Sequence, residues 1–311
     1  MAHESTEAVP AHNRLTHCGV ADVRTHDHHA AYGLAEYGLM LGSSGIWGAS
    51  FILIATSLDH FRPGVVTFVR ITVGAITLAM FKGARVPIER RDWRQIVVLA
   101  VLWLAFPMTL YPIAQQHIST GLTGMLGASI PVFTAVLASI LLHELPKRIH
   151  LMGIVVGAAG IVLLGLPALG EGSNSAFGVA LILIASVSYG VAFNVAVPLV
   201  QKYGSMPVFW RALLVSMPMT LPYALVGLGD STFGWTSTIA NVALGAGGTA
   251  IAFVLLLTLT ARAGATRSSM VTYLEAAFAF LIGTVLRHEP VHALEVIGCG
   301  VLLAGAWLAT L

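Results

Sequence analysis

The stretch SIPVFTAVLASILLHE at residues 129–144 decides the fold of this chain, together with its counterpart LEAAFAFLIGTVLRHE at residues 274–289. Both stretches are mostly apolar and both end on His-Glu, with an offset of 145 between His143 and His288. An apolar run closed by polar residues is typical of a membrane-spanning segment. The chain therefore carries a membrane-type element twice.

The match between the two stretches extends along the chain. Near the start of each half, Trp47 corresponds to Tyr189, and Arg70 corresponds to Arg211. One such match would mean little, but an ordered series predicts that the two halves are repeats of one unit. Further matches at the offset of 145 are Phe133 with Phe278, Gly153 with Gly298, Val156 with Val301, Ala159 with Ala304 and Gly160 with Gly305.

The composition agrees with a membrane protein. Hydrophobic residues make up 57% of the 311 residues and charged residues only 10%, whereas a soluble domain is about 25% charged. This excludes a soluble enzyme, a nucleic-acid-binding protein and a disordered protein. The net charge of +2 indicates no polyanionic partner, and the two cysteines, Cys18 and Cys299, cannot form a disulfide framework.

Cutting the chain at charges, prolines and polar clusters predicts an all-α membrane protein with ten transmembrane helices. The period is helical rather than alternating, which argues against a β-barrel. The predicted spans are 38–58, 63–82, 95–114, 119–142, 149–168, 176–200, 206–228, 237–261, 266–286 and 292–311.

The Lys and Arg residues orient these spans. With a cytoplasmic N-terminus, twelve of the 16 basic residues fall on the cytoplasmic side, and only Arg62 and Arg287 fall outside. Arg70 and Arg211 lie inside spans. The positive-inside rule therefore predicts that both termini are cytoplasmic in a multi-pass protein of the cytoplasmic membrane.

Each half contains five predicted spans, over residues 38–168 and 176–311. Five is an odd number, so the second half is expected upside down relative to the first. Two inverted five-helix repeats are typical of secondary transporters, because related halves can open alternately to either side.

Residues 1–37 are polar and are predicted to form a disordered cytoplasmic tail without a cleaved signal peptide. The tail contains His26-Asp27-His28-His29, which could catch a divalent cation. Because these histidines have no defined spacing on a structured element, we favour a solvated tail and predict no metal site and no cofactor.

A set of motifs recurs along residues 38–311, namely Gly45-Ile46-Trp47-Gly48-Ala49-Ser50-Phe51, Arg62-Pro63 with Arg70, Ser129-Ile130-Pro131-Val132-Phe133 running to His143-Glu144, Gly264-Ala265-Thr266, Thr272-Tyr273-Leu274-Glu275 and His288-Glu289-Pro290. With these motifs the chain resembles the EamA family of the drug/metabolite transporter superfamily over almost its whole length. One departure concerns the ninth span, where the family often has proline after Tyr-Leu-Glu and this chain has Ala276. The first half keeps Pro131 at the matching place, so a proline kink is not supported in the ninth span.

The resemblance implies ten helices, alternating access and a substrate cavity between the halves. It names no single substrate, since the family includes exporters of amino acids and of other metabolites. We therefore expect a secondary transporter, not an enzyme, that exports a small metabolite such as an amino acid, with proton coupling as an open question. The expected partners are this small molecule and the lipid bilayer, with no nucleic acid.

Glu275 lies near the middle of the ninth span, where a charge is costly. We expect its carboxyl group to be protonated or paired, because burial disfavours the charged form. Two interpretations remain open. In the functional interpretation, Glu275 lies in the cavity and either couples transport to protons or binds a substrate amine. In the structural interpretation, it is a protonated acid that forms a hydrogen bond to a neighbouring helix.

Arg70 could hold a substrate carboxylate, since guanidinium makes paired hydrogen bonds to that group. Its depth in the second span would also let it reach an interface or pair structurally, and the sequence favours this structural role for Arg70 and for Arg211. Other polar or amphipathic candidates for the cavity wall lie within or beside the spans, with helix–helix hydrogen bonding as the alternative for each. They are Trp47, Tyr111, Gln115, Tyr189, Asn194 and Tyr273.

Glu144 and Glu289 are expected to make loop or interface contacts, because they end the fourth and ninth spans. The glycines Gly153, Gly157 and Gly160 follow at spacings of three and four residues, which predicts close helix packing, with a homodimer through the same glycines as the alternative.

Two rival functions remain. An intramembrane enzyme would need grouped nucleophiles or paired acids at membrane depth, and Glu275 is the one mid-membrane acid in the sequence. A membrane scaffold or receptor would not need the inverted repeat. The sequence contains no Walker A motif, so the chain is not expected to hydrolyse ATP itself.

Overall fold

The computed structural model describes residues 33–142, 148–171, 173–263, 270–289 and 291–309. Within these ranges the chain is helical and forms no strand. Helix α1 begins at Leu34, four residues before the predicted start of the first span at residue 38. The predicted disorder of the tail, its histidine run and the His143-Glu144 motif lie outside the described residues.

The first half consists of helices that follow the predicted spans closely. The second and third of these spans are linked by two short 3₁₀ turns, η1 and η2. The elements are α1 (Leu34–Leu58), α2 (Pro63–Ala79), η1 (Lys82–Arg85), η2 (Arg90–Asp92), α3 (Trp93–Leu99), η3 (Ala100–Ala105), α4 (Phe106–Ala114), α5 (Thr120–Gly127), α6 (Ile130–Leu142) and α7 (Arg148–Glu171).

The second half has the same order, with fewer breaks. The elements are α8 (Ser173–Tyr203), α9 (Ser205–Leu228), α10 (Trp235–Ala243), η4 (Leu244–Ile251), α11 (Ala252–Ala263), α13 (Met270–Arg287) and α14 (Ala293–Ala309).

Seven helical segments of the described chain are long and apolar enough to cross a membrane. Of the other three predicted spans, α2 and α14 are 17 residues long, and α13, with 18 residues, carries both Glu275 and Arg287. The structure thus supports a multi-pass membrane protein, and the count of ten is not confirmed. The seven are Leu34–Leu58, Arg90–Ala114, Thr120–Leu137, Arg148–Ala168, Ser175–Tyr203, Ser205–Leu228 and Trp235–Leu259.

The proline difference between the two halves has a visible result. The fourth predicted span is broken between α5 and α6, just before Pro131. Helix α13 runs unbroken through Ala276 at the matching place. Pro131 is the second residue of α6, where its missing amide hydrogen costs no helical hydrogen bond. Prolines within the first turn are thus compatible with a new helix start, although other prolines of this chain lie inside helices.

Two predicted spans contain a π-helical segment in their middle. In the third span η3 joins α3 to α4, and in the eighth span η4 joins α10 to α11. A π-helical turn holds one residue more than an α-helical turn and is frequent at functional sites. Neither π-helical segment was predicted from the sequence.

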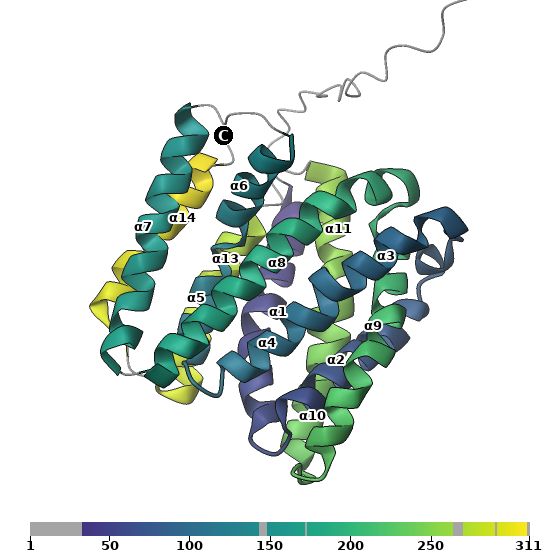
Figure 1. Ribbon diagram of the computed structural model, residues 1–311, viewed down its shortest axis with the longest axis horizontal. Coiled ribbons are helices and arrows are strands. Elements are labelled where there is room, and N and C mark those ends of the chain that lie inside the picture. The colour runs from purple at the N-terminus through teal and green to yellow at the C-terminus, as the bar shows by residue number, and fades with distance from the viewer. Residues whose placement is uncertain (1–32, 143–147, 172, 264–269, 290, 310–311) are drawn as a thin grey trace, which may run out of the picture.

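The helices of one half pack against the helices of the other in a reciprocal way. Helix α1 packs on α13 and on the eighth span, while α8 packs on α5, α6 and the third span. Helix α2 packs on η4 and α9 packs on η3. Figure 1 shows the third span running down from α3 to α4 and the eighth running up from α10 to α11, as inverted repeats require.

Helices α7 and α14, the last of each half, form a pair at one edge of the molecule (Figure 1). A Cβ atom added to Gly160 would overlap the backbone of Leu302, and one added to Gly305 would overlap Gly157. The predicted close packing at these glycines is confirmed. Gly157 and Gly160 face helices of the same chain, and a homodimer stays a prediction.

Glu289 binds the start of α5. Its Oε1 accepts a hydrogen bond from the Thr120 amide at 2.8 Å, and its Oε2 accepts one from the Gly121 amide at 2.9 Å. A carboxylate at a helix N-terminus satisfies free amides and complements the helix dipole. The predicted interface role of Glu289 is therefore confirmed.

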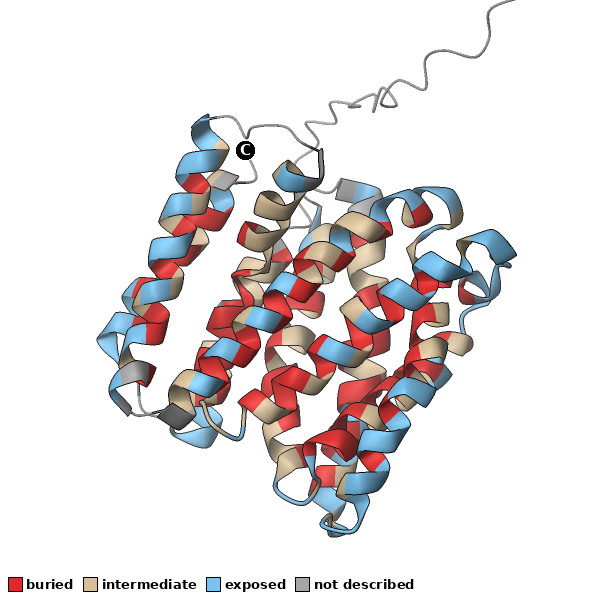
Figure 2. Ribbon diagram, viewed as in Figure 1, coloured by how far each residue is buried: buried red, intermediate tan, exposed pale blue. Residues whose placement is uncertain are grey.

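The burial pattern fits a lipid environment. Figure 2 shows buried residues on the inner faces of the helices and exposed residues on the outer faces. Many exposed side chains are large and apolar, including Ile76, Val155 and Val226, which are 62%, 62% and 79% exposed. A soluble protein would not leave so much contiguous apolar surface uncovered.

Candidate functional site

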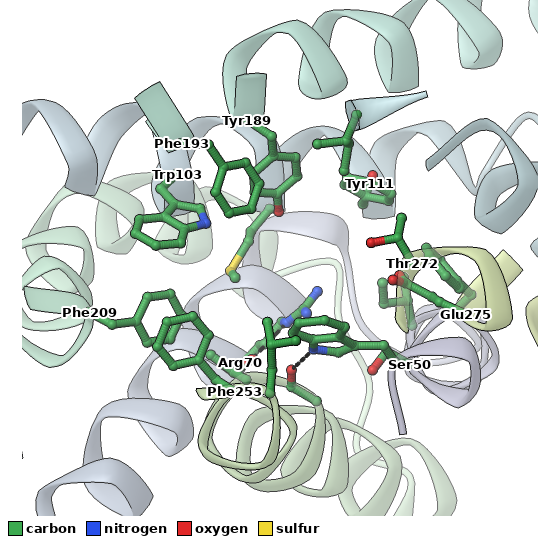
Figure 3. A pocket seen from close by; sticks show the side chains of 18 residues that line it. Ser50, Arg70, Trp103, Tyr111, Tyr189, Phe193, Phe209, Phe253, Thr272 and Glu275 are labelled. Carbon is green, nitrogen blue, oxygen red and sulfur yellow. Dashed lines mark hydrogen bonds between the residues drawn. The ribbon is translucent and has the colours of Figure 1, made fainter. Parts of the chain in front are cut away.

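A cavity of about 160 Å³ lies where the two halves meet, between α1, α2, α8, α9, α13 and the two π-helical spans. Figure 3 shows two kinds of wall. Glu275, Thr272 and Ser50 lie on one side, and Trp103, Phe209 and Phe253 lie on the other. An apolar cavity with a few placed polar groups is the usual form of a small-molecule site.

Arg70 enters the cavity from α2 and is only 9% exposed. Its Nε donates a hydrogen bond to Thr249 Oγ1 at 3.0 Å. Among the described residues, no carboxylate oxygen lies within 4.0 Å of its guanidinium group. Helix α2 packs against α9 and η4. The hydrogen bond to Thr249 is a structural pairing of the kind the sequence favoured for Arg70, and substrate binding by its terminal nitrogens stays a prediction.

Glu275 lines the same cavity from α13. Helix α1 can approach α13 closely here because Gly48 has no side chain: a Cβ atom on Gly48 would lie 3.0 Å from the Glu275 carbonyl oxygen. The Trp47-Gly48 motif thus has a physical role, since Gly48 admits α13 to the cavity wall.

Trp47 and Arg70 are both bound by η4. The Trp47 indole Nε1 donates a hydrogen bond to the Gly248 carbonyl at 2.9 Å, and Thr249 is the next residue along. The π-helical segment therefore presents two successive residues to cavity side chains.

Tyr111 and Tyr189 come from different halves and meet at the cavity wall, with ring centroids 6.2 Å apart. Phe51 packs on Tyr111 at 5.9 Å. Tyr189 corresponds to Trp47 in the repeat, and both line the cavity as the sequence match suggested.

The opposite wall is an aromatic cluster centred on Trp103 of η3. Its ring lies 5.4 Å from Phe193, 5.3 Å from Phe209 and 5.9 Å from Phe253, measured between centroids. Phe209 and Phe253 stack at 3.9 Å. Aromatic surfaces of this kind bind apolar or aromatic groups.

The other predicted site residues do not line this cavity. The Asn194 amide donates to the backbone carbonyls of Thr134 and Gly190, at 3.2 and 2.8 Å. Tyr273 faces a separate apolar hollow beside Trp307. Gln115 caps the C-terminus of α4, away from the cavity wall. The structure offers no argument for substrate contact at these three positions.

Arg211 binds backbone carbonyls, which agrees with the structural role that the sequence favoured. Its Nη1 donates hydrogen bonds to the carbonyls of Ala84 and Pro207, at 3.0 and 3.4 Å. Although Arg70 and Arg211 match in the repeat, only Arg70 reaches the cavity.

Sequence reasoning missed several lining residues, namely Ser50, Phe51, Trp103, Phe193, Phe209, Thr249, Phe253 and Thr272. No sequence feature pointed to Trp103, because its counterpart at the offset of 145, Gly248, was not a candidate either. The phenylalanines carried no signal, since lipid-facing and cavity-facing aromatics look alike in sequence. Within the described residues, no three His, Cys, Asp or Glu side chains are grouped as metal ligands.

Comparison with known proteins places this architecture in a family. A model of the EamA-like transporter family matches residues 34–166 and again residues 176–311. A solved crystal structure aligns with a TM-score of 0.61 at 20% identity, over 88% of this chain and 96% of the other, which shows similarity of fold alone.

Similar proteins are named as transporters or exporters. The chain is 26% identical to the uncharacterized transporter YdfC of Bacillus subtilis (strain 168), covering 88% of each chain. It is 26% identical to the uncharacterized inner membrane transporter YedA of Escherichia coli (strain K12), covering 89% of this chain and 91% of YedA. It is also 26% identical to a probable terminal-alkyne amino-acid exporter of Streptantibioticus cattleyicolor, covering 84% and 89%. The chain belongs to the EamA-like transporter family.

Proposed function

We propose that the protein is a secondary transporter that exports a small amphipathic metabolite, such as an amino acid, across the cytoplasmic membrane by alternating access. In this proposal all ten predicted helices span the bilayer and both termini are cytoplasmic. The main support for this proposal is the cavity between the two halves, which both Arg70 and Glu275 line.

The chemistry of the cavity supports a substrate with both charges and an apolar part. A guanidinium group binds carboxylates through paired hydrogen bonds. A carboxyl group such as that of Glu275 can bind an amine or carry a proton. The aromatic cluster around Trp103 would receive the apolar part. One relative is named a probable amino-acid exporter, which agrees with this substrate class.

Liposomes containing the purified full-length protein test the proposal. A panel of amino acids and related metabolites is offered, with and without a pH gradient. We expect uptake of at least one carboxylate-bearing compound, and we expect Arg70→Gln to abolish it. Arg211→Gln is the matched control, because Arg211 binds carbonyls outside the cavity. A folded protein that moves no compound on the panel would favour a scaffold or receptor.

Proton coupling has its own test. Glu275→Gln mimics the protonated carboxyl group and keeps its hydrogen-bonding shape. If Glu275 carries the coupled proton, the variant should fold and bind substrate but lose the dependence of uptake on the pH gradient. A variant that keeps the full dependence would assign Glu275 a structural or substrate-binding role instead.

The topology is checked by labelling. A cysteine at Arg90 should be protected from a membrane-impermeant reagent in intact cells, because the positive-inside rule places this loop in the cytoplasm. Labelling from outside would overturn the proposed orientation.

A further inference from the structure

We infer that Thr249 is a positioning residue for the substrate: its hydroxyl fixes Arg70 so that the two terminal nitrogens of the guanidinium face a substrate carboxylate end-on. This inference rests on the proposed function and deepens it, because it selects substrates by their carboxylate group. It also gives the π-helical segment η4 a role in recognition.

The hydrogen bond of Arg70 to Thr249 uses Nε and leaves the edge of the guanidinium group with the two terminal nitrogens free. A guanidinium group has five N–H donors, one on Nε and four on the terminal nitrogens. Nε is bound to Thr249 Oγ1 at 3.0 Å, and no described residue accepts from the terminal nitrogens. With only 9% of the residue exposed, these four donors need a partner inside the cavity. A carboxylate is the acceptor that two terminal nitrogens can bind in parallel.

The Thr249 hydroxyl is itself held in place. It donates its single proton to the Leu244 carbonyl at 3.4 Å, five residues earlier, which is the spacing of a π-helix. Its lone pairs are then free to accept from Arg70 Nε. The β-branched side chain has few χ1 rotamers, so the hydroxyl direction is well defined.

Glycines create the space for this contact. A Cβ atom on Gly74 of α2 would lie 2.8 Å from the Thr249 methyl carbon, and one on Gly245 would lie 2.8 Å from the Arg70 carbonyl oxygen. Both distances are shorter than real Cβ atoms tolerate. Helix α2 and η4 therefore meet at the level of Arg70 because glycine is present on both sides.

The π-helical segment aligns two neighbouring contacts. The Gly248 carbonyl accepts from Trp47, and the next residue, Thr249, accepts from Arg70. Trp47 and Arg70 come from α1 and α2, so η4 ties two helices of the first half to one cavity wall. A side chain set by such contacts loses little freedom when it binds, which favours a specific substrate geometry.

The test uses two probes that differ only in the carboxylate. L-Phenylalanine and L-phenylalaninamide share the ring and the amine, and their uptake into liposomes gives KM and kcat for each. In the wild-type protein we expect a preference for L-phenylalanine. Thr249→Val keeps the shape and removes the hydroxyl. We expect it to raise KM for L-phenylalanine by about tenfold, the size of a hydrogen bond to a charged group, with little change in kcat.

The matched variants separate the outcomes. Thr249→Ser keeps the hydroxyl and should retain the preference, and KM for L-phenylalaninamide should not change in Thr249→Val. Equal losses for both probes would indicate a structural role and overturn the inference. A Thr249→Val protein that keeps the preference, when Arg70→Gln abolishes it, would also overturn the inference while leaving the proposed function intact.

Two further results decide the remaining cases. If Thr249→Val does not fold, a folded Thr249→Ser variant without the carboxylate preference would still refute the role of the hydroxyl. If the wild-type protein transports neither probe nor any other carboxylate on the panel, the proposed function fails, and the inference fails with it.

Discussion

The third and eighth spans occupy matching places in the two halves and have the same backbone design. Each contains a π-helical segment, η3 beginning at Ala100 and η4 at Leu244, close to the offset of 145 that relates His143 to His288. Each packs against the other half, η3 on α8 and α9 and η4 on α1 and α2. The repeat has thus kept the geometry of this span.

The chemistry of the two spans has diverged. At matching positions, η3 carries Trp103, which builds the aromatic wall, and η4 carries Gly248, whose carbonyl binds Trp47. One span therefore supplies an apolar surface and the other supplies polar contacts. A symmetric scaffold in this way encloses an asymmetric cavity, which suits a substrate with one polar and one apolar end.

The first residues of the third and eighth spans also make different kinds of contact, one charged and one without a carboxylate. Asp92 accepts hydrogen bonds from Lys202 at 2.8 Å and from the Tyr203 hydroxyl at 2.6 Å, at the end of α8. At the matching place Ser237 lies 3.0 Å from His60 Nδ1, just after α1. Because the spans run in opposite directions (Figure 1), the charged and neutral contacts lie at opposite ends of the molecule.

The largest effect is expected when Gly248 of η4 is given a side chain. A Cβ atom on Gly248 would overlap the Ser50 hydroxyl. We expect Gly248→Val to abolish transport and to lower the free energy of unfolding by about 1–3 kcal/mol, because overpacking displaces the neighbouring helix. Uptake assays and thermal unfolding measure both effects.

Gly247→Ala is the control for this substitution. Its Cβ atom would meet Ile46 at an ordinary 3.6 Å, so transport should persist. Equal tolerance of both changes would contradict the close packing of η4 on α1.

A second prediction concerns the aromatic wall of η3. Trp103→Leu removes ring contacts with Phe193, Phe209 and Phe253 while keeping an apolar side chain. We expect KM for L-phenylalanine to rise by about tenfold, since an aromatic pair contributes about 0.5–1.5 kcal/mol, and KM for L-leucine to change less. A uniform loss for both substrates would show that Trp103 supports the fold and not ring recognition.

The charged contact should respond to salt. Asp92→Asn removes the carboxylate that binds Lys202 and Tyr203. We expect this end of the molecule to open more often, as measured by distances between spin labels on α3 and α8. In the wild-type protein, opening should increase with salt, because exposed ion pairs are screened. The variant should show a weaker salt dependence, because Lys202 keeps its ion pair with Glu89 at 3.1 Å. An unchanged salt response would remove Asp92 from the contact.

The neutral contact should give the smallest effect. Ser237→Ala removes its hydrogen bonds with His60 and with the Thr56 carbonyl. A neutral hydrogen bond contributes about 0.5–1.5 kcal/mol, so we expect modestly increased opening between α1 and α10, without salt dependence. If Ser237→Ala increased opening more than Asp92→Asn does, the charged contact would not be the stronger of the two.

Several features of the fold were predictable from local sequence. The unbroken α13 at Ala276 agrees with the absence of a proline there, whereas the break before Pro131 was not predicted, because the fourth span was expected as one segment over 119–142. The close contact of α7 with α14 follows from glycine spacing, and the contact of Glu289 follows from its place at the end of a span.

The cavity lining was only partly predictable. Trp47, Arg70, Tyr111, Tyr189 and Glu275 line it, whereas Gln115, Asn194 and Tyr273 do not. In a soluble helix the apolar stripe marks the buried face. In a membrane both the lipid-facing and the protein-facing sides are apolar, so the sequence pattern does not show which way a side chain points.

The membrane class, the repeat and the family follow from composition and from the order of residues along the chain. The burial of Arg70, its hydrogen bond to Thr249 and the position of Trp103 at the cavity are visible in the folded chain alone. These placements depend on how α2, η3 and η4 pack against helices far away in sequence. The burial of a charged side chain is a property of its neighbours in space, and no local pattern encodes it.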